Sequence, residues 1–132
     1  MAGRVPLANR VVLGLLASPL HRLLDRSVVG LRLRGTRSGQ PVVLPVMHAV
    51  DDEGLVVLPG HADGKRWWRN LRRPAALLVL TGGAWRPGSG WVLGPGEPGY
   101  QRALGTYRRR WPRTPPAAVG PVVRIRLDST RS

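Results

Sequence analysis

Cysteine and phenylalanine are absent from this chain of 132 residues, and lysine occurs once, as Lys65. Without cysteine the chain has no disulfide, no thiolate metal site and no cysteine nucleophile. The three histidines, His21, His48 and His61, do not have the spacing of a metal-binding triad. We therefore expect no metal site. The lack of cysteine is compatible with a reducing cytoplasm.

Acidic residues are also scarce, with 7 Asp+Glu against 21 Lys+Arg and a formal net charge of +14. Such a charge favours polyanionic partners: nucleic acid, an acidic membrane, or a phosphorylated or carboxylated ligand. A composition rich in Arg, Gly, Ala and Pro also fits the mutational bias of a GC-rich genome, so the charge alone does not identify the partner. Nucleic acid ranks last, because the chain has no recognised nucleic-acid motif or platform of interleaved aromatics.

No apolar run is long enough for a transmembrane helix. Residues 7–26 predict a helical segment, interrupted where Ser18 and Pro19 end one helix and begin another. Arg4 and Arg10 precede a short apolar run, as in a signal peptide. Further charged residues follow this run too soon, so we do not expect a signal peptide. A cytoplasmic location follows, with peripheral contact between this helix and an acidic membrane as the open alternative.

The 17 glycines and 13 prolines are spread along the chain, which is typical of frequent turns between short strands. A short helix is predicted near 64–72, and another begins near Glu97 and Pro98. Apolar or alternating segments predict strands over residues 28–33, 41–50, 55–59, 75–82, 84–94 and 121–127. We therefore expect one domain over residues 1–132, mainly β with peripheral helices, arranged as a small β-barrel.

The segment RGTRSGQP, residues 34–41, lies between two of these strands. Its glycines and serine are ordinary turn residues, so a plain hairpin is the simpler interpretation. Glycine also allows a ligand close to backbone N–H groups, Thr36 and Ser38 add hydroxyls, and Arg34 and Arg37 add forked cationic donors. The turn is therefore suited to phosphate or carboxylate, although it lacks the spacing of a P-loop.

A second cluster, KRWWRNL, places Trp67 and Trp68 side by side. On a helix they point in different directions, so we expect one indole in the core. The other would lie under Arg69 or Arg72 as a cation–π pair. The alternative sets one indole against a flat ligand, with Asn70 bonded to the ligand or back to the chain.

Together, GTRSGQPVVLPV and the aromatic pair before Asn-Leu resemble the deazaflavin-dependent nitroreductase and quinone reductase family, over roughly residues 7–127. The resemblance implies a split β-barrel related to the flavin-binding pyridoxamine-phosphate-oxidase type. It implies the deazaflavin coenzyme F-420, with FMN a weaker second choice, and hydride transfer to a quinone-like or nitro acceptor. The phosphate and glutamates of the coenzyme tail are anionic and would explain the positive net charge of the chain.

The family motifs also imply which residues contact the coenzyme. Arg37 stands where the family usually has lysine, Thr36 where it has arginine, and Met47 where an aromatic is frequent. The reduced ring supplies the hydride and solvent can supply the proton, so no catalytic acid or base is assigned. The implied cofactor-binding residues are Gly35, Thr36, Arg37, Ser38, Gly39, Gln40, Pro45, Met47, Trp67 and Asn70.

Two departures from the family concern the acceptor side. The residues Val57, Leu58 and Pro59 replace a Ser-Lys-like pair near the ring, and Tyr100 and Tyr107 are the only tyrosines. Leu58 and Pro59 beside the ring predict a more apolar acceptor pocket, and hence a preference for lipophilic quinones. The alternative function is a non-catalytic coenzyme- or lipid-binding split-barrel protein. The sequence leaves open whether the chain forms a homodimer.

Overall fold

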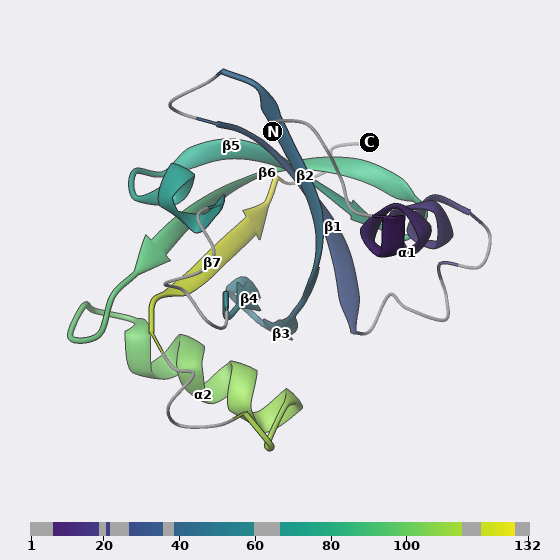
Figure 1. Ribbon diagram of the computed structural model, residues 1–132. Coiled ribbons are helices and arrows are strands. Elements are labelled where there is room, and N and C mark those ends of the chain that lie inside the picture. Colours follow the sequence, from purple (N-terminus) through teal and green to yellow (C-terminus); the bar gives the residue numbers. More distant parts are fainter. Residues whose placement is uncertain are drawn as a thin grey trace.

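The computed structural model describes residues 7–18, 21, 27–35, 39–59, 67–114 and 120–128. These residues are mainly β, with one helix near each end and a 3-10 helix between them (Figure 1). The elements are α1 (Leu7–Ala17), β1 (Val28–Arg34), β2 (Pro41–Met47), β3 (Ala49–Asp51), β4 (Gly54–Val57), η3 (Trp67–Leu71), β5 (Ala75–Thr81), β6 (Ala84–Leu93), α2 (Tyr100–Arg110) and β7 (Val122–Leu127).

All seven strands form one antiparallel sheet in the order β2-β1-β5-β6-β7-β4-β3. The two edge strands, β2 and β3, are consecutive in the chain and separated only by His48. In a flat sheet of this width the edges would lie roughly 29 Å apart, at about 4.8 Å per strand. A single residue cannot span that distance, so the sheet curls until its edges meet at His48 (Figure 1). The prediction of a mainly β, barrel-like fold is confirmed.

The concave face of the curled sheet holds the main core. Burial alternates along β1, where Val29, Leu31 and Leu33 point inward and Arg32 and Arg34 are exposed. The 3-10 helix η3 closes this core. A Cβ on Gly90 would lie 2.7 Å from Leu77 and 3.2 Å from Leu71, which shows how tightly η3 packs over β6. The buried cluster consists of Val29, Leu31, Leu33, Leu55, Val57, Trp67, Leu71, Leu77, Val79, Val123 and Ile125.

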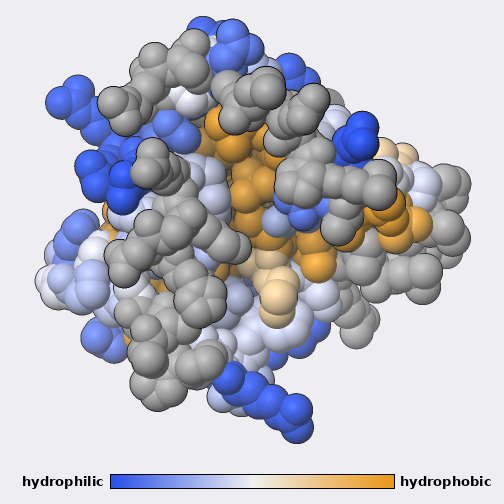
Figure 2. Space-filling model, viewed as in Figure 1, coloured by the Kyte–Doolittle hydropathy of each residue, from blue (hydrophilic) through white to orange (hydrophobic). Residues whose placement is uncertain are grey.

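Both α-helices lie on the outer face of the sheet. A Cβ on Gly30 would come within 2.9 Å of Leu13, so the glycine lets α1 approach β1 closely. At the other end α2 packs over β3, β4 and β7, through Tyr100, Ala103 and Tyr107. Figure 2 shows apolar side chains gathered over β2 and α1. No helix in the described part of the chain is both long and apolar enough to cross a bilayer.

The first predicted helix ends at Ala17, which confirms the break expected at Ser18 and Pro19, and Ser18 Oγ donates a 2.8 Å hydrogen bond to the Leu15 carbonyl. Residues 19, 20 and 22–26, where a second helix is predicted, lie outside the described segments. The last begins at Tyr100, not near Glu97. Glu97 instead closes a turn, because its carboxylate accepts the Gly94 N–H at 3.0 Å.

The other differences are smaller. The predicted strand 41–50 is two strands, β2 and β3, because the chain bends at His48 to pass from one sheet edge to the other. Strand β4 covers Gly54–Val57, so Leu58 and Pro59 follow it as buried coil. The helix predicted near 64–72 is the 3-10 helix η3, and residues 64–66 lie outside the described part.

Candidate functional site

The segment that joins β1 to β2 is a hairpin, as its turn residues predicted. The Gly35 N–H donates to the Gln40 carbonyl at 2.9 Å, and the Gly39 N–H donates to the Gly35 carbonyl at 2.8 Å. Gly39 has φ 71°, a left-handed conformation that favours glycine. Gln40 is exposed. Thr36, Arg37 and Ser38, between Gly35 and Gly39 in the sequence, lie outside the described residues.

A cavity of about 260 Å³ lies between this hairpin and η3. It brings Gly35 and Gly39, from the first sequence motif, together with Asn70 from the second. The Asn70 Nδ2 donates to the Trp67 carbonyl at 2.9 Å, which holds the amide in place on η3. We name this space the hairpin cavity. Its lining residues are Leu33, Arg34, Gly35, Gly39, Asn70, Leu71, Ala75 and Ala76.

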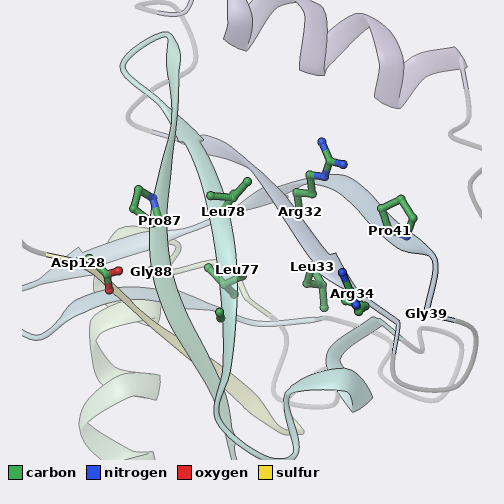
Figure 3. A pocket seen from close by; sticks show the side chains of 11 residues that line it. Arg32, Leu33, Arg34, Gly39, Pro41, Leu77, Leu78, Pro87, Gly88 and Asp128 are labelled. Atoms are coloured by element: carbon green, nitrogen blue, oxygen red, sulfur yellow. The ribbon is translucent and has the colours of Figure 1, made fainter.

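A larger cavity of about 370 Å³ lies beside it along β1, β5 and β6 (Figure 3). We name it the outer cavity, because Arg32 and Leu78 enter it from the side of the sheet that carries α1. The two cavities adjoin, because both are lined by Leu33, Arg34, Gly39 and Ala76. The lining residues are Arg32, Leu33, Arg34, Gly39, Pro41, Ala76, Leu77, Leu78, Pro87, Gly88 and Asp128.

The hairpin cavity is suited to an amphipathic anion, but not through the backbone of its glycines. The N–H groups of Gly35 and Gly39 are already used inside the hairpin. An anion in this cavity would therefore be bound by the Arg34 guanidinium and by residues 36–38. Leu33, Leu71 and Ala75 form the apolar wall of the cavity. Among the described lining residues none is an acid or a base that titrates near neutral pH.

The tryptophan pair follows the packing interpretation. Trp67 is only 9% exposed and belongs to the main core. Trp68 is half-buried, and the guanidinium carbons of Arg69 and Arg72 lie 5.6 and 5.5 Å from its ring centroid. Trp67, which the resemblance assigns to the coenzyme, does not line the hairpin cavity or the outer cavity.

Two predicted ligands on β2 lie away from the hairpin cavity. Pro45 pairs with Gly30, and its ring lies on the outer face where α1 packs. Met47 is 46% exposed at the far end of the strand, about 20 Å from Pro41 at 3.3–3.4 Å per residue. It lines a separate cavity of about 360 Å³, together with Tyr107, Trp111, Pro112, Arg113 and Thr114.

The residues expected beside the ring are buried. Val57 belongs to the main core and Leu58 to the cluster under α2, and Pro59 is buried next to them. None of the three lines the hairpin cavity, the outer cavity or the cavity at Met47. Tyr100 is also buried, and its hydroxyl donates to the Gly120 carbonyl at 2.8 Å. Residues 60–66, which follow Pro59, lie outside the described part of the chain, so an apolar acceptor pocket at Leu58 and Pro59 stays a prediction.

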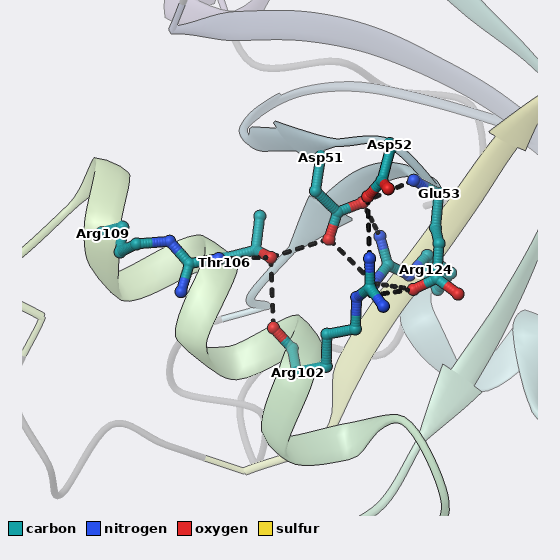
Figure 4. Close-up of polar contacts among 7 residues, drawn as sticks. All are labelled: Asp51, Asp52, Glu53, Arg102, Thr106, Arg109 and Arg124. Atoms are coloured by element: carbon teal, nitrogen blue, oxygen red, sulfur yellow. Dashed lines mark hydrogen bonds and ion pairs between the residues drawn. The ribbon is translucent and has the colours of Figure 1, made fainter.

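Sequence reasoning missed an ionic cluster that fastens α2 to the sheet (Figure 4). Arg124, 4% exposed, donates to both carboxylate oxygens of Asp51, and the Thr106 hydroxyl donates to the same carboxylate at 2.7 Å. Burial raises the pKa of Asp51, but hydrogen bonds from Arg124, Thr106 and the Glu53 N–H outweigh it and lower the pKa to about 2. In the sequence, the segment DDEG over residues 51–54 is typical of a turn and gives no sign of this cluster.

Comparison with known proteins adds no assignment. The sequence matches no protein-family model and no curated protein.

Proposed function

We propose that this protein binds the deazaflavin coenzyme F-420 and transfers hydride from its reduced ring to a quinone-like or nitro acceptor. The observation that carries the proposal is the hairpin cavity. It unites Gly35 and Gly39 with Asn70, from the two separate segments that resemble the deazaflavin-dependent family. We also propose that the curled sheet belongs to the split β-barrel class of flavin-binding proteins.

The described residues fit the tail of such a coenzyme better than its ring. Arg34 would bind phosphate or carboxylate at the hairpin, and Arg37 would add a second forked donor. The absence of side chains at Gly35 and Gly39 leaves room for the tail beside the turn. Asn70 would position the ligand from η3. The bound coenzyme would supply the hydride, and the protein would orient donor and acceptor and exclude water.

The alternative is a coenzyme- or lipid-binding protein without turnover. It is favoured by the lining of the hairpin cavity, which offers arginine, asparagine, glycine and aliphatic side chains but no described proton donor for an acceptor. Peripheral membrane contact belongs with this alternative. Arg10 and Val11 are exposed on α1, and Figure 2 shows apolar side chains at this helix.

Titration of the purified protein with oxidised deazaflavin, reduced deazaflavin and FMN tests binding, and a menadione-type quinone then tests turnover. We expect deazaflavin to bind more tightly than FMN, and the reduced form to be reoxidised by the quinone. Binding without reoxidation would favour the non-catalytic alternative. Tighter binding of FMN, or no binding of either, would contradict the proposal.

A further inference from the structure

Arg32 and Arg34 form a pair of cations on the outer face of β1. They are two residues apart in one strand, so their Cα atoms are about 7 Å apart. Both side chains are exposed, and both line the outer cavity. Neither guanidinium has an ion pair or hydrogen bond to any residue that the structure describes. This contrasts with Arg124 and Arg102, whose charges are matched by carboxylates.

The remaining wall of the cavity offers little that would bind a compact anion. Pro41, Leu78 and Pro87 are apolar, and Pro41 and Pro87 have no N–H. At Arg32 the backbone lies between β2 and β5, with which β1 pairs. The available donors are therefore two forked guanidiniums held apart by the strand. Such a pair matches two separate carboxylates, each bound bidentately, better than one phosphate.

One acidic residue lines the same cavity at its other end. Asp128 follows β7, and its backbone N–H donates to the Pro87 carbonyl at 2.9 Å. In Figure 3 its carboxylate lies beside Pro87 and Gly88, away from Arg32 and Pro41. Its charge opposes an anion at that end. Anionic groups are thereby directed to the β1 end, and an uncharged chain to Leu78 and Pro87.

We infer that the outer cavity is a binding site for chain-like dicarboxylates, held by Arg32 and Arg34. The site goes beyond the proposed function, because it needs no deazaflavin ring and uses Arg32, which does not line the hairpin cavity. It adjoins that cavity, and Arg34 lines both, so a longer anionic ligand can occupy both.

Calorimetric titration of the full chain with adipate, whose carboxylates lie at the ends of a four-methylene chain, tests the inference. Arg32→Gln should weaken adipate binding by about two- to fivefold, the range expected for an exposed charged contact. The matched control is Arg86→Gln. It removes the same charge from an exposed position on β6 that lines none of the cavities, and should change binding by less than about twofold.

Two further variants test the sign of the charges that line the cavity and the need for a forked guanidinium. Asp128→Asn should tighten adipate binding by about twofold, because it removes a like charge from the cavity. Arg32→Lys should recover only part of the affinity, because a lysine has no fork. An unchanged melting temperature in each exposed variant would confirm that folding is preserved.

Three results would overturn the site: no adipate binding, tighter binding of pyrophosphate than of adipate, or equal weakening by Arg32→Gln and Arg86→Gln. The last would show a response to net charge alone. Because adipate has no ring, these results would leave the deazaflavin proposal standing. Conversely, failure to bind deazaflavin would leave adipate binding as a separate result.

Discussion

Arg124 donates 2.7 and 3.1 Å hydrogen bonds to the two carboxylate oxygens of Asp51, a residue 73 positions earlier in the chain. Both side chains are largely buried, at 4% and 11% exposed. Burying two charges carries a large desolvation cost, so the pair depends on this bidentate geometry and on the added hydrogen bond from Thr106. The pair and its hydrogen bond from Thr106 thus hold β7, the β3–β4 turn and α2 together.

Replacing Asp51 with Asn should therefore destabilise the fold strongly. It removes the carboxylate that neutralises the buried Arg124, whose other ion pair among the described residues is the longer 3.4 Å contact to Glu53. We expect a loss of about 3 kcal/mol in the free energy of unfolding, measured by urea denaturation. Asp52→Asn is the control. Its pair with Arg102 is 84% and 55% exposed, so it should cost less than about 1 kcal/mol. Equal losses would contradict this account.

The same pair predicts a loss of stability in acid. The pKa of Asp51 is about 2 in the folded chain, against 3.8 for an ordinary aspartate, so the unfolded chain binds this proton more readily. The contribution of Asp51 is complete above pH 3.8 and is lost as the pH falls through 3.8 towards 2. Unfolding measured across that range should show a steeper decline in wild type than in Asp51→Asn. Parallel curves would refute the assignment.

A third prediction concerns the packing of η3. Gly90→Ala would place a methyl group 2.7 Å from Leu77 and 3.2 Å from Leu71, both buried, so we expect a loss of about 1–3 kcal/mol. Gly14→Ala is the matched change in an open position. No atom lies within 4 Å of its new Cβ, and a helical alanine should stabilise by about 0.5–1 kcal/mol. Thermal unfolding of the two variants should therefore shift in opposite directions.

The local elements could largely be predicted from the sequence. Alternation in β1 and the final apolar alternation gave strands close to the observed bounds, and the glycine-rich turn gave the hairpin. These features depend on neighbouring residues only. The bend at His48 could not be predicted in the same way, because the segment 41–50 is apolar on both sides of this histidine and the bend follows from joining the two sheet edges.

The candidate site also has some features that depend on neighbouring residues and others that depend on tertiary contacts. The Trp67 and Trp68 environments followed from adjacency on a helix, which forces one indole inward. Exposed Arg32 and buried Arg124 both lie in alternating strand patterns, RLR and RIR, that look alike in the sequence. Only the tertiary partner distinguishes them: Asp51 meets Arg124, and no described carboxylate meets Arg32.

The most direct test of the central claim compares full-length coenzyme F-420 with a ring fragment that lacks phosphate and glutamates, at low and high salt. Arg34→Gln and Arg37→Ala should each weaken the full-length coenzyme by about tenfold, through the loss of one charge-assisted hydrogen bond, and barely affect the fragment. The difference should shrink as salt rises. Arg86→Gln should leave both ligands unchanged. Equal responses of coenzyme and fragment would contradict the tail site and leave RGTRSGQP as a hairpin alone.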